Sequence, residues 1–444
     1  MIISFSVQNF RSVKEEQTLS FEAAKNKDYE EYMVINAGKY RLLKMIALFG
    51  NNASGKTNIL IAMTCLRELA INTRERGVLL PAEPFGFDEQ SRRDNCRLSA
   101  VFLVRTEDVF KKYRYSVEFN RQVITREKLD QYMSSQPALV YSRETVRDGS
   151  AYKTSVRFGR SVRLSQAEKD AILINTLENM TVLSSFRKIN VSFSEAKCVF
   201  DWFREGVIDP VSPKTQIKIS ATEYFSKNEN KEFILPFLQN SDFNISEISF
   251  RKQNMPLPQI LSPKDEIEPI RPDKDVSVLI GLRDTEIIKP EFTHFYMNKE
   301  KKTENGVLPA EAESSGTIRT FGLAAPFHKA LSENGLLMID EIETSLHPRI
   351  VEYLMLVFLV NSKEAQLVFT THNISLMKSE FMRPDVIWFT EKDETGATEL
   401  YPLAGFSGVK MAKVREQYEA GKFGAYPHVW NYRLNVIFQK EREK

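Results

Sequence analysis

The hydrophobic pattern near the start of the chain predicts a strand followed by a helix. Residues 44–49 (KMIALF) form a short, nearly continuous apolar run, which is typical of a strand buried on both faces. Downstream, apolar residues recur at intervals of three and four positions, at Ile59, Ala62, Met63, Leu66, Leu69 and Ala70. This spacing gathers them on one face of a helix, which can pack against the sheet that contains the strand.

The same pattern occurs again in the last third of the chain. Residues 336–339 (LLMI) are a short apolar run, and residues 366–373 (QLVFTTHN) contain another that leads to His372. Both runs predict buried strands. The segment between them has helical spacing, with apolar residues at Ile350, Val351, Leu354, Val357 and Phe358. A helix that joins two strands makes them parallel neighbours, so we expect their C-terminal ends to meet at one edge of the sheet.

The remaining patterns complete an α/β fold class. Alternation at the N-terminus (IISFSVQ) predicts a strand, residues 97–104 and 114–120 predict an antiparallel β lobe, and residues 385–403 predict a hairpin. Helices are expected within 167–204 and 231–240, and a loop over the proline-rich residues 256–272. We therefore expect a mixed sheet flanked by helices, formed by residues 1–130 and 306–444. A mainly helical inserted lid domain is expected over residues 131–305.

Composition narrows the possible functions. The 444 residues exceed one average domain, and 61 basic against 59 acidic residues give a net charge of +2. That balance argues against a globally basic surface for nucleic acids. Three widely spaced cysteines form neither a disulfide framework nor a zinc motif. With no apolar run of 18 residues and no signal-peptide pattern, we expect a cytoplasmic protein without a membrane segment.

Residues 50–57 (GNNASGKT) fit the phosphate-binding pattern G-x-x-x-x-G-K-[ST]. They lie between a predicted strand and a predicted helix, where backbone N–H groups and a helix N-terminus can point together at an anion. We expect Lys56 to reach the β- and γ-phosphates of a nucleotide and the Thr57 hydroxyl to bind Mg²⁺. The predicted phosphate-binding residues are Gly50, Asn51, Asn52, Ala53, Ser54, Gly55, Lys56 and Thr57.

Two carboxylates and a histidine follow the later apolar strands. Asp340 and Glu341 end the run at 336–339. We expect Asp340 to hold Mg²⁺ together with Thr57, and Glu341 to polarise the water that attacks the γ-phosphate. His372 ends the neighbouring strand, where an imidazole can donate a hydrogen bond to the γ-phosphate. Glu341 and His372 are therefore the predicted catalytic residues.

A second candidate anion site lies at residues 313–317 (ESSGT), which open another apolar-periodic helix. Its predicted ligand-binding residues are Ser314, Ser315 and Gly316. One nucleotide has one γ-phosphate, and residues 50–57 already cover it. We therefore expect the second site to serve the nucleotide of another copy of the chain, in a head-to-tail pair.

The order of these motifs resembles the ABC-type ATPase heads of the RecF/SMC-like group. More narrowly, it resembles the stand-alone AAA-family or abortive-infection ATPases of bacterial anti-phage systems, of the PARIS, Septu or RloA type. In that group ESSGT corresponds to the signature loop and residues 343–348 (ETSLHP) to the loop after the catalytic glutamate. Arg11 matches a basic position near the nucleotide, and residues 418–427 resemble a tail motif. No glutamine matches the group's Q-loop.

The resemblance implies an ABC-type P-loop ATPase head that uses ATP and Mg²⁺ and forms at least a dimer of heads. It also implies a switch that controls a separate effector protein, such as a TOPRIM- or HNH-type nuclease, with a phage trigger or DNA as a possible ligand. A RecF-like DNA-repair ATPase would share every motif, and a P-loop kinase is an alternative of a different class.

We expect no nuclease chemistry in the chain itself. The next candidate acids, Asp273 and Asp275, have no obvious strand-borne acidic partner. Glu266 and Glu268 are expected to lie in a solvated loop. The histidines outside the ATPase motifs lie far apart in sequence, at His294, His328 and His428.

Overall fold

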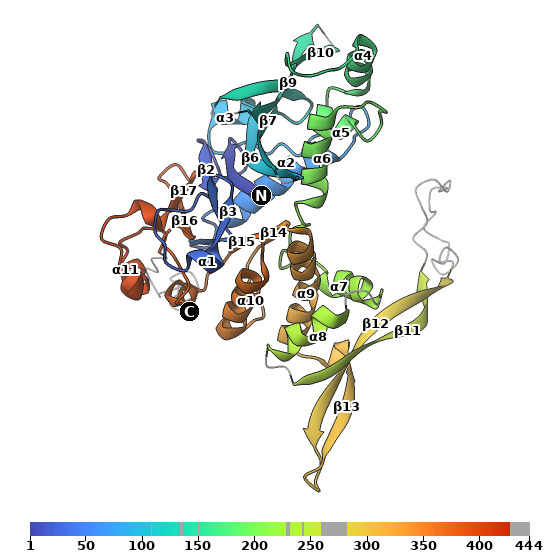
Figure 1. The fold of residues 1–444 in the computed structure, drawn as a ribbon, viewed down its shortest axis with the longest axis vertical. Helices are drawn as coiled ribbons and strands as arrows, with labels where there is room; N and C mark the ends of the chain where they lie inside the picture. The colour runs from blue at the N-terminus through green and yellow to red at the C-terminus, as the bar shows by residue number, and fades with distance from the viewer. Residues whose placement is uncertain are drawn as a thin grey trace, which may run out of the picture. The chain divides into compact units, whose positions relative to one another are not determined.

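The computed structural model describes residues 1–107, 109–133, 136–149, 151–227, 231–241, 244–258 and 282–426 (Figure 1). The chain forms two compact units. The first consists of Met1–Pro213, Lys329–Thr344 and Pro348–Lys444, and the second of Lys214–His328 and Ser345–His347. The functional division at residues 131 and 305 stays a prediction.

A five-stranded sheet forms the centre of the first unit. Its order is β14 (Leu336–Ile339), β15 (Gln366–Thr370), β5 (Met45–Gly50), β16 (Ile387–Lys392) and β17 (Thr398–Pro402). The first four strands are parallel, and β17 is antiparallel to β16. Every residue of β14, β15 and β5 is buried, which is why their sequences are continuous apolar runs. The C-terminal ends of these four parallel strands therefore meet at one edge.

Helices connect and cover these strands as expected. α10 (Pro348–Asn361) joins β14 to β15 and begins with proline, which tolerates the first helical position because that N–H has no partner in the helix. Lys44 Nζ, just before β5, donates to the carbonyls of Leu359 (3.2 Å) and Ser362 (2.7 Å). These bonds satisfy carbonyls at the C-terminal end of α10, so that β5 and α10 hold each other in place.

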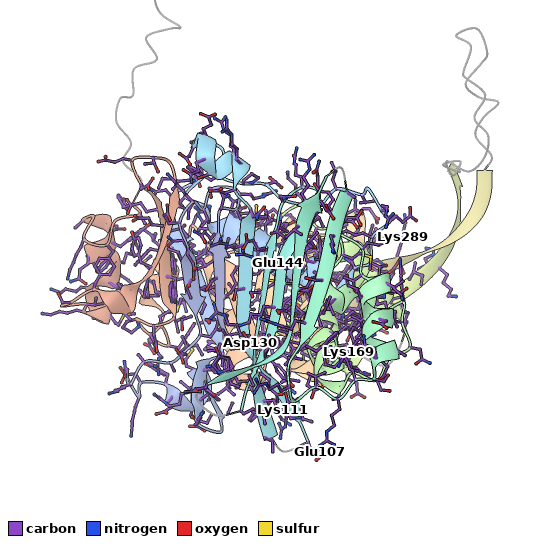
Figure 2. The ribbon with its side chains drawn as sticks, turned by 90° about the horizontal axis from the view of Figure 1, so that it is seen from above. Glu107, Lys111, Asp130, Glu144, Lys169 and Lys289 are labelled. Atoms are coloured by element: carbon purple, nitrogen blue, oxygen red, sulfur yellow. The ribbon has the colours of Figure 1, made fainter. Side chains whose placement is uncertain are left out.

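A seven-stranded antiparallel sheet forms the β lobe of the same unit. Its order is β10 (Ala151–Phe158), β9 (Pro137–Asp148), β8 (Ile124–Tyr132), β7 (Val109–Phe119), β6 (Cys96–Thr106), β1 (Ile2–Gln8) and β2 (Gln17–Ser20). Figure 2 shows these strands side by side, with Asp130 on β8 and Glu144 on β9. Helix α2 (Lys56–Ile71) contacts β1 and β6 of this sheet and also β5 of the other. The expected α/β class, with a mixed sheet, flanking helices and an antiparallel lobe, is confirmed.

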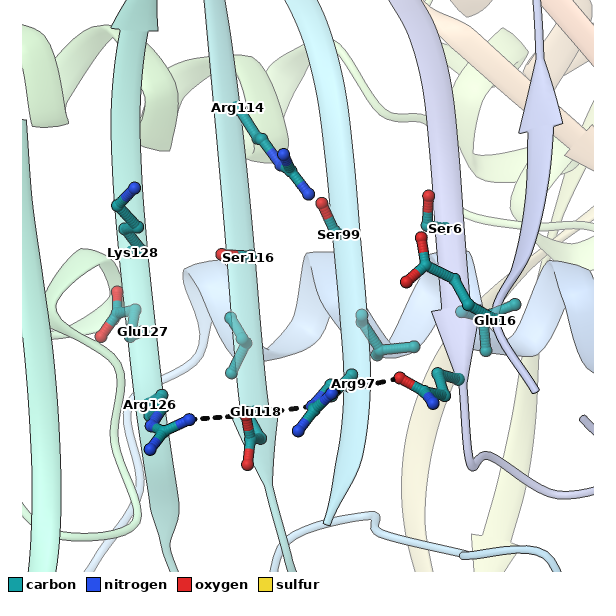
Figure 3. Close-up of a pocket in the computed structure, with 14 residues that line it drawn as sticks. Ser6, Glu16, Arg97, Ser99, Arg114, Ser116, Glu118, Arg126, Glu127 and Lys128 are labelled. Carbon is teal, nitrogen blue, oxygen red and sulfur yellow. Dashed lines mark hydrogen bonds and ion pairs between the residues drawn. The ribbon is translucent and has the colours of Figure 1, made fainter. Parts of the chain in front are cut away.

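One face of the seven-stranded sheet is polar and encloses a hollow of about 390 Å³ (Figure 3). Ser6, Ser99 and Ser116 are register partners on β1, β6 and β7, and their small side chains leave space above the sheet. Beside them, Arg97 Nε lies 3.1 Å from a carboxylate oxygen of Glu118, and Arg126 pairs with the same carboxylate at 3.9 Å. The two guanidinium groups, on β6 and β8, therefore share the carboxylate on β7 between them.

Smaller elements complete the first unit. The predicted hairpin at 385–403 is confirmed by β16 and β17, and the helices predicted within 167–204 are confirmed as α4, α5 and α6. The further elements of this unit are α1 (Glu30–Met33), β3 (Val34–Ala37), β4 (Tyr40–Leu43), α3 (Glu89–Arg93), α4 (Gln166–Asn175), α5 (Val182–Ser185), α6 (Ser194–Glu205) and α11 (Val414–Glu419).

The second unit combines helices with a three-stranded antiparallel sheet. Its elements are α7 (Ile217–Ser226), α8 (Lys231–Gln239), β11 (Ile245–Pro258), β12 (Leu282–Met297), β13 (Thr303–Pro309) and most of α9 (Ser315–Glu333). The rings of Phe225 and Phe292 each pack against Phe321, with centroid distances of 6.4 and 5.4 Å. This aromatic cluster joins α7, β12 and α9.

Two expectations need correction here. The mainly helical character expected over 131–305 holds for residues 166–239, but β9 and β10 precede that part and the sheet of β11, β12 and β13 follows it. The loop expected over 256–272 begins later, because β11 extends to Pro258. Prolines are tolerated in β11 because it is an edge strand of its sheet. Residues 259–272, together with Asp273, Asp275, Pro427 and His428, lie outside the described residues.

None of the helices in the described ranges combines the length and the apolar character that a membrane span requires.

Candidate phosphate-binding site

The loop after β5 depends on glycine at both of its ends. Gly50 has φ 151° and Gly55 has φ 113°, backbone conformations that other residues rarely adopt. A Cβ atom on Gly50 would lie 2.4 Å from the carbonyl oxygen of Thr390, and one on Gly55 would lie 2.2 Å from Thr398 Oγ1. Both threonines belong to the β16–β17 hairpin. The loop can approach this hairpin closely only because these two positions have no side chain.

Hydroxyl groups hold the loop against the same hairpin. Ser54 Oγ lies 2.6 Å from Thr390 Oγ1, and Thr398 Oγ1 donates to the Ser54 carbonyl at 2.8 Å. Ser54 is buried, whereas Asn52 and Ala53 are exposed at the tip of the loop. The hydrogen bonds fix the base of the loop and leave its tip open to a ligand.

Lys56 lies beneath the loop at the start of α2. Its Nζ donates to the carbonyls of Gly50 (2.8 Å) and Asn51 (2.9 Å) and lies 3.4 Å from His372 Nδ1. Burial lowers the pKa of Lys56 to about 8, although nearby carboxylates, Asp340 first among them, oppose that change. At neutral pH the ammonium is therefore the main form, and the site contains a buried cation.

Thr57 and Asp340 lie in contact at the C-terminal edge of the five-stranded sheet. Thr57 Oγ1 lies 3.0 Å from both carboxylate oxygens of Asp340, and Thr370 Oγ1 donates to Asp340 Oδ1 at 2.7 Å. A hydroxyl and a carboxylate are the hard oxygen ligands that Mg²⁺ takes from proteins when phosphates supply others. The two side chains therefore fit the predicted metal position.

Glu341 follows Asp340 but its side chain makes different contacts. Its φ of 49° turns the chain out of the direction of β14. Its backbone N–H donates to Thr370 Oγ1 at 2.8 Å, and Thr344 Oγ1 lies 3.4 Å from its carboxylate oxygen Oε2. Glu341 is half-buried, and its side-chain contact with Thr344 differs from the contacts of Asp340 with Thr57 and Thr370.

His372 lies at the end of the neighbouring strand, as expected. Burial lowers its pKa below the ordinary range, and Lys56 lowers it further, so the imidazole is neutral at pH 7. Because the Lys56 ammonium can only donate, Nδ1 is the acceptor and the ring proton is on Nε2. His372 therefore presents a neutral N–H donor.

Sequence reasoning did not identify two residues that support this site. Glu343 Oε1 accepts the backbone N–H of His372 at 2.6 Å, which ties the loop after β14 to the end of β15. Thr370 binds both Asp340 and the backbone of Glu341. Both residues belong to motifs that the sequence analysis quoted, but their spacing does not reveal which group each one contacts.

Arg11, which the resemblance predicts to be near the nucleotide, lies beside the loop. Its guanidinium pairs with Glu83 at 2.8 Å and lies 3.4 Å from the side-chain oxygen of Asn58. Together with Ala53 and Asn58 it lines a hollow of about 680 Å³. Arg11 Nε is buried and has no hydrogen-bond partner among the described residues.

The second predicted anion site belongs to the second unit. Ser314 precedes α9, and its hydroxyl accepts the backbone N–H of Thr317 at 3.0 Å, which is an N-cap contact. Ser314 and Ser315 are exposed. A Cβ atom on Gly316 would lie 3.1 Å from the carbonyl oxygen of Ser345, so this position is crowded. His294 Nε2 lies 2.6 Å from the carboxylate oxygen Oε1 of Glu313, the residue before Ser314.

Comparison with solved structures finds, among other chains, three heads of structural-maintenance-of-chromosomes (SMC) proteins. The first is the SMC head domain from Thermotoga maritima, with 13% sequence identity and a TM-score of 0.40 over 90% of this chain and 98% of that chain. The second is an SMC head bound to the C-terminal winged-helix domain of ScpA, with 14% identity and a TM-score of 0.37 over 90% of this chain and 97% of that chain. The third is an SMC head with an extended coiled coil bound to the C-terminal domain of ScpA, derived from Pyrococcus furiosus, with 12% identity and a TM-score of 0.38 over 95% of this chain and 99% of that chain. Comparison with curated proteins finds no matching sequence.

Residues 45–378 match the family model described as "AAA domain, putative AbiEii toxin, Type IV TA system". The match includes the loop at 50–57, Asp340, Glu341 and His372, and it extends over well more than half of the chain. The chain therefore belongs to this family of AAA-domain proteins.

Proposed function

We propose that the chain binds ATP together with Mg²⁺ and hydrolyses it to ADP and phosphate. The observation that carries this proposal is the convergence of Lys56, Asp340 and His372 at one edge of the sheet, from the ends of β5, β14 and β15. A buried cation, a hydroxyl–carboxylate pair and a neutral N–H donor suit a triphosphate. Family membership supports the same assignment.

Thr57 and Asp340 would hold the metal ion, which supplies neutralisation of phosphate charge when bound. Lys56 would exchange its present carbonyl partners, Gly50 and Asn51, for oxygens of the β- and γ-phosphates. The loop backbone between Gly50 and Gly55 would surround the β-phosphate with N–H groups. Arg11 would add a positive charge on the nucleoside side of the loop.

Glu341 would act as the general base. Its carboxylate accepts the proton of the attacking water, and the water oxygen forms a bond to the γ-phosphorus as the bond to the β–γ bridging oxygen breaks. His372 would donate its Nε2–H to a γ-phosphate oxygen. Its neutral state leaves the single donor that this role needs.

We further propose that ATP pairs two copies of the chain head to tail. Ser314, Ser315 and Gly316 of one copy would contact the γ-phosphate held by the other copy. The exposure of Ser314 and Ser315 at the start of α9 supports this role. Pairing would depend on the bound triphosphate, because ATP can shift an equilibrium only through its different affinity for the two states.

The paired form would serve as a switch over a separate effector protein, such as a nuclease or toxin, in cytoplasmic defence against phage. The family description, which refers to toxin–antitoxin systems, supports this part of the proposal.

Phosphate release from ATP by the purified chain tests the proposed reaction. We expect Mg²⁺-dependent release without any added acceptor molecule, which also separates an ATPase from a kinase. The Lys56→Ala variant is expected to lose binding or turnover, and light scattering should detect dimers with ATP but not with ADP. Absence of phosphate release by the wild-type chain at saturating ATP and Mg²⁺ would contradict the proposal.

A further inference from the structure

The order of the strands gives a bound triphosphate a direction. The side chains suited to the γ-phosphate, Asp340 and His372, follow β14 and β15, on one side of β5. On the other side of β5 lie β16 and β17. A nucleotide whose terminal phosphate points toward β14 and β15 therefore extends its nucleoside toward the β16–β17 hairpin.

A hollow of about 680 Å³ lies on that side of the loop. Its lining includes Arg11, Ser12, Ala53, Asn58, Phe87 and Lys392. Ala53 belongs to the phosphate-binding loop and Asn58 to the first turn of α2, so the hollow adjoins the place of the phosphates. Its volume lies within the range of about 300–1,000 Å³ that small-molecule sites have. We call it the Phe87 hollow.

Phe87 is the large apolar side chain that this hollow exposes, with 81% of its surface accessible. A single exposed phenylalanine is common on protein surfaces, so its exposure alone says little. Phe87 differs because its ring is held in place. The ring packs edge-on against Phe85, with centroids 5.6 Å apart and planes at 87°, and a Cβ atom on Gly396 would lie 3.1 Å from Phe87 Cδ2.

The backbone on both sides of Phe87 is fixed as well. Phe85 is buried, and its N–H donates to Asn9 Oδ1 at 3.0 Å. Asp88 caps α3 by accepting the N–H of Ser91 at 2.8 Å. An aromatic ring that is both exposed and ordered loses little conformational freedom when a ligand packs on it.

Three polar side chains around the ring, Lys392, Asn58 and Arg11, each make a hydrogen bond or an ion pair within the protein. Lys392 Nζ donates to the Gly396 carbonyl at 2.8 Å, and Asn58 Nδ2 donates to Ser12 Oγ at 2.7 Å. The Arg11 guanidinium is paired with Glu83. Because these polar groups are already engaged, a nucleobase can pack on the ring face of Phe87 more readily than it can form hydrogen bonds through its edge.

We propose that Phe87 is the platform on which the nucleobase of the bound nucleoside triphosphate stacks, and that the hollow selects a purine by its ring face. This inference rests on the proposed ATP binding and adds the base-binding residue to it. Recognition by stacking implies weak discrimination between adenine and guanine, because both offer a similar face.

Calorimetric titration of the full chain with ATP, GTP and inorganic tripolyphosphate tests the platform. The variants are Phe87→Ala, Phe87→Tyr and, as a matched control on another exposed aromatic, Tyr32→Ala. We expect Phe87→Ala to weaken ATP binding at least about fivefold, as loss of one base–aromatic stack does. Its affinity for tripolyphosphate should stay within about twofold of the wild type. Phe87→Tyr and Tyr32→Ala should bind ATP as the wild type does, and GTP should bind within about tenfold of ATP.

Unchanged ATP affinity in Phe87→Ala, or equal weakening of ATP and tripolyphosphate, would overturn the platform while leaving ATP binding intact. A preference for ATP over GTP well above tenfold would overturn recognition by the ring face. If the wild-type chain binds neither ATP nor GTP, the proposed function fails together with this inference.

Discussion

The hydroxyl of Thr57 lies 3.0 Å from each carboxylate oxygen of Asp340, although 283 positions separate the two residues in the chain. Thr57 stands in the first turn of α2, directly after the phosphate-binding loop, and Asp340 directly after β14. They meet because β15 pairs in parallel with both β5 and β14, so that the C-terminal ends of all three strands share one edge. This pair defines where a metal ion and a nucleotide would meet.

Asp340→Asn is expected to reduce Mg²⁺-dependent ATP turnover by at least about 100-fold, because an amide neither neutralises the metal ion nor replaces a carboxylate ligand well. Turnover measured over a range of Mg²⁺ concentrations checks this. Asp148→Asn, at an exposed strand end, is the matched control. Turnover near the wild-type rate in Asp340→Asn would remove Asp340 from the metal site.

Glu341→Gln is expected to retain ATP binding and to lose turnover by about 10²–10⁴-fold, because the amide cannot accept the proton of the attacking water. Blocked hydrolysis should also make the ATP-bound dimer accumulate. Turnover assays and light scattering on the same sample measure both effects, with Glu31→Gln as an exposed control. If Glu341→Gln hydrolyses ATP at the wild-type rate, the general base is a different residue.

A mixing experiment tests whether the ESSGT segment acts on a second copy of the chain. Lys56→Ala removes the lysine that we propose to bind the phosphates, and Ser315→Trp blocks the start of α9 at an exposed position. Neither variant should turn over ATP alone, but an exchanged mixture should regain part of the activity, because one of its two composite sites keeps both elements. A mixture that stays inactive although subunit exchange is demonstrated would argue against contact between copies.

The pKa of Lys56 predicts how ATP binding depends on pH. Its folded-state value of about 8 lies below the ordinary 10.5. The ammonium is lost as pH rises through about 8, so ATP affinity should fall between pH 7.5 and pH 9.5. Titrations across that range check this, and Lys56→Arg, whose guanidinium stays protonated, should show a smaller fall. An equal fall in both proteins would contradict the role of Lys56.

The same pKa affects the stability of the nucleotide-free protein. Between about pH 8 and pH 10.5 the folded chain binds fewer protons at Lys56 than the unfolded chain does, so the contribution of this residue to stability rises with pH across that window.

Gln366→Leu should destabilise the fold without touching the candidate site. Gln366 is buried, accepts the N–H of Ile2 at 2.6 Å, and donates to the carbonyls of Ile2 and Leu43 at 3.1 Å each. Leucine would leave these buried groups unpaired, so we expect a loss of at least about 2 kcal/mol in the free energy of unfolding. The thermal midpoint measures this, with the exposed Gln166→Leu as control. Equal midpoints for the two variants would contradict the role of Gln366.

Much of the fold could be predicted because its elements depend on local patterns. The apolar runs that became β5, β14 and β15 are continuous because all their residues are buried. The end of β11 was predicted as a loop because it contains Pro256 and Pro258, which are tolerated there because β11 is an edge strand of its sheet.

By itself, the sequence determined which loop, acids and histidine are the candidates for binding a nucleotide and a metal ion, because each is a short motif next to a strong apolar pattern. Only the tertiary structure decided that Glu343 orients the end of β15, that Thr398 makes glycine necessary at position 55, and that Phe87 stands over a hollow beside the loop. These relationships join segments far apart in the chain. Their distances depend on how the sheets and loops pack, and spacing along the sequence does not encode that packing.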